Sequence, residues 1–301
     1  MSKQITHAAI AIPALLLLAG IVAGCGGSNP PPTPSKLNLA VTDTPVDSAD
    51  KVVVAFTGVE LMGPGGQTSF PFSTERTLDL LTLQGNASAM LLNGVTVTAG
   101  DYQWLRLDVD EANSYVISST GGKFPLNVPS GSESGLKLVS GFTVAQGNTA
   151  DFVIDFDLRH SLTLDNKGGT TTYTLKPVLR LIDMQQVGSV TGTVAASLSI
   201  GGTLITATTC SPAVYVYNGT GVVPEGYNVT VTGGTAPLTS ATVSLNTTSG
   251  AYDYTVGFLA PGTYTLAATC AAMDTTGATT LAFSTSQTAV VTANTATTIN
   301  F

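Results

Sequence analysis

Hydrophobic residues alternate with polar ones over most of the chain beyond residue 35. In the first half the alternating runs include KLNLAVTD, KVVVAFTGVEL, YQWLRLDVD, FVIDFDLR and TYTLKPVLRLID, and in the second half AVYVY, YNVTVTG, SATVSLNTT, AYDYTVGF and GTYTLAATC. A period of two is typical of strands that bury one face, and clusters such as GPGG and PSGSESG between the runs favour turns. Only NASAMLLNG favours a short helix. The pattern predicts an all-β protein.

The N-terminal segment follows a different pattern. Lys3 precedes an apolar stretch over residues 8–23, and the tetrapeptide VAGC ends at Cys25. A charged start, a short apolar run and small residues are typical of a secretory signal. The interrupted run is marginal as a permanent membrane anchor, so cleavage is the favoured interpretation. The tetrapeptide resembles the lipobox of bacterial lipoproteins, whose cysteine is diacylated and becomes the first residue of the mature chain. We therefore predict a cleaved lipoprotein signal peptide at 1–24 and a lipidated Cys25 that begins a Gly/Pro-rich tether at 25–35.

This segment also predicts where the protein resides. Acyl chains on Cys25 would hold it on a bilayer, so membrane lipid is its expected partner. The next residue is Gly26, not the Asp that resembles an inner-membrane retention signal, which favours the outer membrane in a Gram-negative host. The expected location is therefore the bacterial cell envelope.

Charge divides the rest of the chain into two parts. All 11 Lys and Arg lie at or before Arg180, and of the 19 Asp and Glu only Glu225, Asp253 and Asp274 follow residue 184. We place a boundary near Gln186. With turn signals about every ten residues, the segments 36–185 and 186–301 are predicted to be two β-sandwich domains of Ig-like or prealbumin-like type.

Several motifs carry a family resemblance. In the first half TDTPVD, FTGVEL, LDLLTL, VPSGSESGLKL, IDFDLRHS and LKPVLRL, in this order, resemble a family of uncharacterised bacterial lipoprotein domains known only as a domain of unknown function. That resemblance implies a secreted, usually lipid-anchored β-domain with no established activity. In the second half SGAYDYTVGFLAPGTYTLAATC resembles the carboxypeptidase-regulatory-like, prealbumin-type sandwiches, which are normally structural appendages.

Two further cysteines, Cys210 and Cys270, remain once Cys25 is acylated. An exported protein meets an oxidising compartment, where a pair of cysteines in one small domain most often forms a disulfide. We predict that they are linked; the alternative is two buried thiols.

Composition excludes several function classes. A net charge of −8 disfavours nucleic acid as a partner, and no phosphate-binding loop or other cofactor motif is present. Outside the signal segment the only histidine is His160, which excludes a His-rich metal centre. No nucleophile motif accompanies His160, so we interpret it as an exposed residue at a strand end.

Alternation also predicts a charged strand face. Asp155, Asp157 and Arg159 lie on the face opposite Phe152, Ile154, Phe156 and Leu158. The same alternation places Arg106, Asp108 and Asp110 on one face of a second predicted strand, opposite its apolar residues. It places Lys176 and Arg180 on one face of a third predicted strand. The favoured interpretation is ion pairing on a solvated sheet; the alternative is a polar groove for a ligand.

A second acidic group, Asp43, Asp47 and Asp50, lies in TDTPVDSAD after the first strand. Asp residues in such turns usually bond to the nearby backbone, and Ca²⁺ binding is the alternative.

Two functions follow. The first is a non-catalytic envelope protein whose domains bind a glycan, an ion or an envelope protein, or help to build the cell surface. The alternative is an envelope glycan hydrolase that uses paired carboxylates. Because no nucleophile, cofactor loop or metal-ligand set is recognisable, we expect a protein that is not an enzyme and needs no cofactor.

Overall fold

The structure is a computed structural model that describes residues 34–44, 49–129, 135–167, 170–176, 178–227, 232–270 and 281–301. The expected signal peptide and Cys25 lie outside this range. The described chain belongs to one compact unit, Thr33–Phe301. Its helices are the short segments η1 (Leu80–Thr82), α1 (Leu158–Ser161) and η2 (Met184–Gln186), and the rest is strands and connections, so the all-β prediction is confirmed. None of the helices among the described residues could span a bilayer.

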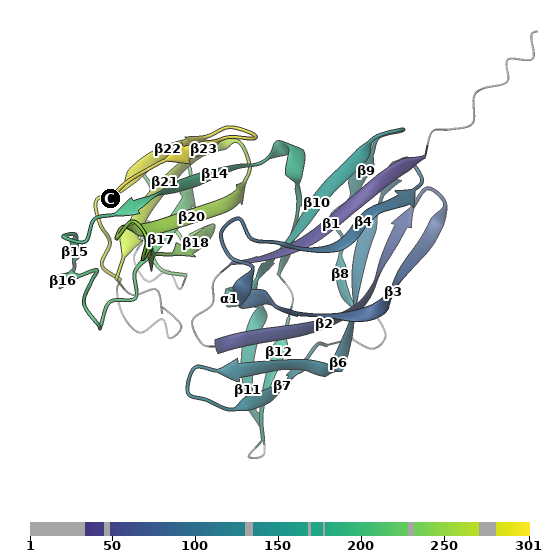
Figure 1. Ribbon diagram of the computed structural model, residues 1–301, viewed down its shortest axis with the longest axis horizontal. Helices are drawn as coiled ribbons and strands as arrows, with labels where there is room; N and C mark the ends of the chain where they lie inside the picture. The colour runs from purple at the N-terminus through teal and green to yellow at the C-terminus, as the bar shows by residue number, and fades with distance from the viewer. Residues whose placement is uncertain are drawn as a thin grey trace, which may run out of the picture. The chain divides into compact units, whose positions relative to one another are not determined.

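The first half of the chain forms two principal sheets (Figure 1). One has the order β13-β10-β1-β4, with β1 (Ser35–Thr44), β4 (Ala89–Val97), β10 (Thr149–Asp157) and β13 (Leu179–Asp183). The other has the order β11-β12-β7-β6-β2-β3, with β8 paired to β6; its strands are β2 (Ala49–Gly63), β3 (Gly66–Asp79), β6 (Trp104–Ser118), β7 (Lys123–Asn127), β8 (Leu136–Leu138), β11 (Leu162–Lys167) and β12 (Thr170–Leu175). A small pair, β5 (Gly100–Tyr102) and β9 (Phe142–Val144), completes this half.

The apolar faces of these two sheets form one hydrophobic core. From the first sheet come Leu39 of β1 and Ile154 of β10, both fully buried. From the second come Phe56 of β2 and Leu107 of β6, also fully buried. The rings of Phe56 and Phe156 meet edge to face with centroids 6.2 Å apart. The apolar side of each predicted alternation therefore faces the core, as a sandwich requires.

The second half builds a separate core. One sheet has the order β19-β20-β14-β23, from β14 (Gly188–Val194), β19 (Ser244–Leu245), β20 (Tyr252–Leu259) and β23 (Ala296–Thr298). The other has the order β18-β17-β21-β22, from β17 (Ala213–Asn218), β18 (Thr239–Thr242), β21 (Gly262–Thr269) and β22 (Gln287–Val291), and a two-stranded ribbon joins β15 (Ser199–Ile200) to β16 (Thr203–Leu204). Buried Val190, Val216, Tyr254 and Leu266 belong to this core.

The helix predicted for NASAMLLNG is wrong, because this segment contributes to strand β4. Residues Ala89 to Val97 pair antiparallel with β1, with Met90 opposite Ala40. Leu91 and Leu92 are buried in the core. Pairing with an already buried strand outweighs the modest local preference of Ala, Met and Leu for helix.

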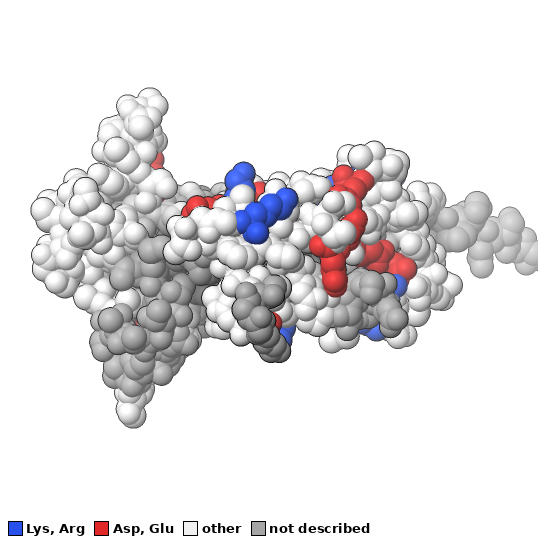
Figure 2. Space-filling view, turned by 90° about the horizontal axis from the view of Figure 1, so that it is seen from below, with Lys and Arg blue, Asp and Glu red and all other residues white. Residues whose placement is uncertain are grey.

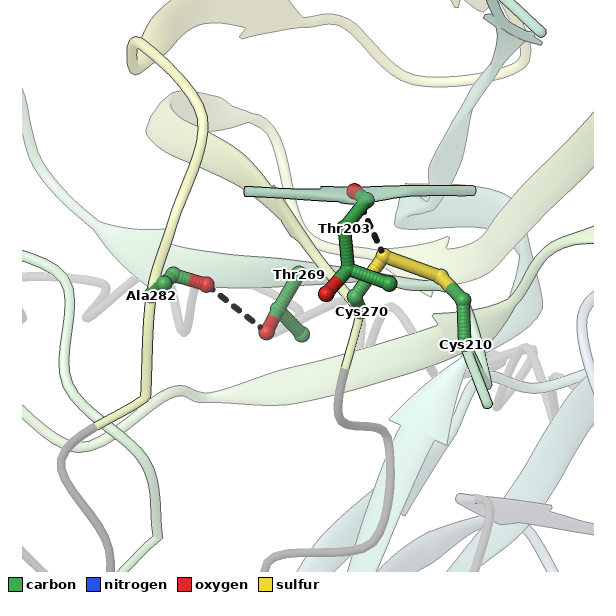
Figure 3. Close-up of a disulfide and its surroundings, with 5 residues drawn as sticks. All are labelled: Thr203, Cys210, Thr269, Cys270 and Ala282. Atoms are coloured by element: carbon green, nitrogen blue, oxygen red, sulfur yellow. Dashed lines mark hydrogen bonds between the residues drawn. A yellow bond between two sulfur atoms is a disulfide. The ribbon is translucent and has the colours of Figure 1, made fainter. Parts of the chain in front are cut away.

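The predicted link between Cys210 and Cys270 is confirmed (Figure 3). Their Cα atoms are 4.7 Å apart, within the usual range for a disulfide. Cys210 precedes β17 and Cys270 follows β21, two strands that pair antiparallel. The backbone N–H of Ser211 donates to the carbonyl of Cys270 at 3.0 Å, so the bond extends an existing ladder.

We expect no titratable thiol from Cys210 and Cys270 in the denatured, unreduced protein, measured in a Cys25→Ser background. Reduction should lower the free energy of unfolding by roughly 4 kcal/mol, since a disulfide that closes a loop of about 60 residues restricts the unfolded chain. In a Cys210→Ser/Cys270→Ser variant the reductant should have no effect on the urea midpoint. Two titratable thiols before reduction would contradict the bond.

Candidate functional site

The charged face predicted on three strands is divided between two sheets. The strand with Asp155 (β10) and the strand with Arg180 (β13) are neighbours in the first sheet, whereas β6, with Arg106 and Asp108, belongs to the second. The three predicted strands therefore do not share one charged face. The third of them is also wrong as a single strand, because Lys176 follows β12 of the second sheet whereas Arg180 lies on β13 of the first. Strand pairing is a long-range property that alternation within each strand does not report. In the view of Figure 2, acidic and basic side chains gather over part of the surface and large areas carry neither.

Asp155 and Arg180 form a cross-strand ion pair. They are opposite each other in the antiparallel register of β10 and β13. Nε of Arg180 donates to Oδ2 of Asp155 at 3.0 Å, and Nη2 donates to the same oxygen. This ion pair agrees with the favoured interpretation, which expected ion pairing on a solvated sheet. Asp155 is not solvated, however, because its side chain is only 7% exposed, against 37% for Arg180. The pair is thus part of the packed structure.

The surroundings of Asp155 are polar and confined. Thr42 and Asp43 of β1 are buried beside it, and Thr42 is the parallel partner of Asp155. The hydroxyl of Thr42 lies 2.8 Å from the carbonyl oxygen of Leu83. Thr42, Asp43, Asp155 and Arg180 line a small cavity. The centre of a water molecule can move within about 20 Å³ of it. That volume holds about one water molecule and excludes a sugar or other organic ligand.

Asp157 caps the short helix α1. Its Oδ1 accepts from the backbone N–H of His160 at 3.2 Å, and its Oδ2 lies 2.6 Å from Nδ1 of the same residue. The fully buried Ser161 donates its hydroxyl to the carbonyl of Asp157 and accepts from the N–H of Val178. Asp157, His160 and Ser161 therefore hold a turn together, and the serine hydroxyl is engaged by backbone on both sides. The side chain of Arg159 lies outside the described residues.

The acidic turn is described only in part. Asp43 is 5% exposed at the end of β1, Asp50 is exposed at the start of β2, and Asp47 lies outside the described residues. In the described part of the chain no three His, Cys, Asp or Glu side chains are grouped to hold a metal ion. Calcium binding by this turn stays a prediction.

A depression of about 340 Å³ lies beside β10 and β13 and includes Asp151 and Asp183, which the sequence analysis did not single out. Asp151 accepts a hydrogen bond from the amide of Asn38. Asp183 accepts from the backbone N–H of Gln185 at 2.9 Å and so caps η2. Both carboxylates hold local structure.

A second group lies on the second sheet, and the sequence analysis found only Arg106 and Asp108 of it. It is called here the Trp104 platform and consists of Trp104, Arg106 and Asp108 of β6, Glu60 of β2, Gln67 of β3 and Lys137 of β8. Strand register brings them together, because Glu60 is opposite Arg106 and Arg106 is opposite Lys137. Alternation in β6 put Arg106 and Asp108 on one face but carried no signal for Glu60 or Lys137, which lie far away in sequence.

Burial shifts the ionisation of one platform residue. The pKa of Asp108 is raised, first because the carboxyl is partly buried and then because the charge of Glu60 is close. The neighbouring Arg106 lowers the pKa of Asp108 and offsets part of this shift. Arg106 therefore holds the Asp108 carboxylate in place, although the partial burial of that carboxylate disfavours its charged form.

Comparison with known proteins supports the resemblance seen in the first half. Residues 34–177 match the family model described as Domain of unknown function (DUF4382). No curated protein matches the chain at a significant level.

The chain is distantly similar to several solved structures. The minor pilin of Streptococcus agalactiae is 9% identical with a TM-score of 0.20, over 88% of this chain and 94% of that one. The major pilin subunit of Bacillus cereus is 11% identical with a TM-score of 0.21, over 89% and 99%. A leucine-rich repeat protein from Bacteroides thetaiotaomicron is 14% identical with a TM-score of 0.23, and this chain, covered over 89%, spans 26% of its length.

We expect Asp155→Asn to lower the free energy of unfolding by about 1–3 kcal/mol, because it removes one charge from a largely buried ion pair and leaves the guanidinium without its counter-ion. The matched control is Lys51→Gln at the pair that Lys51 forms with Asp79, where the lysine side chain is 54% exposed. That change should cost under about 0.5 kcal/mol. Urea denaturation of both variants measures the difference, and equal small losses would contradict the buried pair.

Proposed function

We propose that this chain is a lipid-anchored protein of the bacterial cell envelope with a non-catalytic binding or structural role at the cell surface or in the periplasm. The lipid anchor is Cys25, and the outer membrane is the expected site in a Gram-negative host. The partners expected of such a protein are envelope glycans or envelope proteins.

Two features support the envelope location. The tetrapeptide VAGC follows an apolar run and precedes a Pro-rich segment, the order found in lipoprotein precursors. The disulfide between Cys210 and Cys270 belongs to a protein that folds in an oxidising compartment, because cytosolic thiols are kept reduced.

The observation that carries the non-catalytic role is the structural use of the candidate acids. Asp155 is held by Arg180 beside a cavity that admits one water molecule, and Asp157 caps α1 through His160. A glycoside hydrolase needs two carboxylates that flank a bound sugar, one of them free to exchange a proton. The acids in the larger depression, Asp151 and Asp183, are also used to hold neighbouring side-chain and backbone groups. A binding or structural role is therefore better supported than the hydrolase alternative.

The anchor is tested by replacing Cys25 with Ser in cells fed an alkyne-labelled fatty acid. The wild-type chain should incorporate the label and sediment with membranes, because the acyl chains supply its bilayer affinity. Cys25→Ser should take up no label and be found as a soluble or precursor form, whereas Cys210→Ser, the matched control, should still be labelled. A labelled, membrane-bound mature Cys25→Ser protein would refute the anchor.

A further inference from the structure

We infer that strand β11 is a self-association edge, at which two copies of this chain join their second sheets as an antiparallel pair. The inference goes beyond the proposed envelope role and uses it only for the high local concentration that a shared membrane gives. β11 is the last strand of the second sheet (Figure 1). It is bonded to β12 on one side and to no other strand of the described chain.

The register of β11 shows which of its backbone groups are free. Residues 162–167 pair with residues 170–175 without a shift, so two residues form the turn of the hairpin. In such a hairpin the residues that flank the turn bond to each other, and bonded pairs then alternate with non-bonded pairs. The backbone groups of Leu162, Leu164 and Asn166 therefore point away from β12. The N–H of Leu162 bonds within α1, which leaves its carbonyl and both groups of Leu164 and Asn166 for a further strand.

β11 lacks the irregularities that protect two other edge strands of this half. Edge strand β4 has register shifts in its pairing with β1, and its Met90 carbonyl accepts a hydrogen bond from Arg76 at 2.6 Å. Edge strand β3 also has a register shift, and it contains Pro71, which has no N–H to donate. Bulges and prolines of this kind hinder the addition of a strand. β11 has neither, so its edge can accept one.

An exposed leucine marks the centre of this edge. Leu164 is 50% exposed, whereas Tyr173, its partner on β12, is 6% exposed and belongs to the core of the first half. Directly opposite residues of a sheet point to the same face, so Leu164 extends the apolar face one strand beyond the core. A strand added to β11 would cover Leu164.

The sequence of β11 is complementary to itself. An antiparallel pair centred on Leu164 places this leucine opposite Leu164 of the second copy, and Thr163 opposite Asp165 of the second copy. Thr163 is exposed, and its hydroxyl can donate to the Asp165 carboxylate, whose Oδ2 already accepts from Thr174 at 2.7 Å. Each contact occurs twice about a twofold axis, as in an isologous interface. A foreign strand would have to supply both an apolar residue and a donor at these positions, whereas a second copy has them.

Charge selects this register over the neighbouring one. A pair centred on Asp165 would place two carboxylates directly opposite each other, which is destabilising. In the pair centred on Leu164, residues 162–166 of each copy are paired and Lys167 lies beyond them. Leu164 then exchanges backbone bonds with its counterpart, and the N–H of Asn166 donates to the carbonyl of Leu162 in the other copy.

The short length of the edge makes the association weak. A pair of single strands buries less than the roughly 1,200 Å² of a stable interface. Tethering to one membrane raises the effective concentration of the partner and so compensates for a small contact. The dimer is therefore expected on a membrane and not in dilute solution.

Disulfide trapping of the full lipidated chain in phospholipid vesicles tests the pair. Under mild oxidation Leu164→Cys should give a linked dimer, because bonded cross-strand partners have Cα atoms about 5.5 Å apart, within the range of a disulfide. The matched controls on the same strand are Thr163→Cys and Asp165→Cys, whose own counterparts are offset by two residues along the strand. They should give little dimer.

The absence of a linked Leu164→Cys dimer, or equal linking of all three variants, would overturn the inference. Membranes of expressing cells, oxidised in the same way, test the partner. Leu164→Cys linked there to another protein and not to a second copy would also overturn it.

A charge placed at the centre of the edge gives a second test. Copies labelled with donor and acceptor dyes at Thr98→Cys, an exposed position, report association in vesicles by energy transfer. Adding Leu164→Lys should weaken the association about tenfold or more, because it places two like charges opposite each other. The matched control is Met90→Lys, since Met90 is 47% exposed on edge strand β4. Met90→Lys should associate like the parent, and an equal loss in both variants would contradict the edge. Circular dichroism shows whether each variant is folded, and if Leu164→Lys unfolds, the disulfide trapping decides.

The wild-type chain separates this inference from the lipid anchor. With Cys25 acylated and Cys210 bonded to Cys270, the wild type has no free thiol and should form no linked dimer. Linking of the wild type would reveal a free Cys25 and refute the anchor alone. The three single-cysteine variants would then be compared in a Cys25→Ser background, where the same outcomes decide the edge.

Discussion

The first half of the molecule depends on the pairing of β1 with β10. These two strands run parallel from Lys36 opposite Thr149 to Thr44 opposite Asp157, and β1 is also bonded to β4 on its other edge. A parallel pair cannot be made by a tight hairpin, and the long intervening chain forms β4 of the first sheet and β2, β3, β6, β7 and β8 of the second before it reaches β10. The pairing therefore aligns the apolar side of the first sheet with β2 and β6, and it also sets Thr42 beside Asp155.

The pairing of β1 with β10 explains why the charged residues of the first half lie in two different environments. On the first sheet the side opposite the core is also covered at Asp155, so its carboxylate is buried and needs the bidentate donors of Arg180. On the second sheet the charges at Glu60, Arg106 and Asp108 reach solvent and form a network around Trp104. The buried pair contributes to the packing of the fold, whereas the network on the second sheet still reaches solvent.

Local pattern predicted strands such as β2, β6 and β10 and the direction of their side chains, since alternation directly reports which face is apolar. It was wrong for TYTLKPVLRLID, which the structure divides into β12 of the second sheet and β13 of the first. It also placed both Asp155 and Arg180 on charged strand faces, and the structure pairs these two residues. It failed for β4, where pairing with β1 overrides the helix preference of Ala89 to Leu92, and for the extent of burial of Asp155, which depends on what covers the outer side of the sheet. Glu60 and Lys137 were missed because their proximity to Arg106 is created by strand register between distant segments. Trp104 lies two residues before Arg106 on the same strand, so alternation placed it on the same face.

Hydrogen exchange measured by mass spectrometry tests the dependence on β1 and β10 most directly. If their pairing holds the fold together, amides in 35–44 and 149–157 should exchange only through global unfolding and be the slowest in the first half of the chain, while edge strand β3 exchanges through local opening. Exchange of β1 and β10 as fast as that of β3, at conditions where the core of β2 and β6 stays protected, would contradict the account.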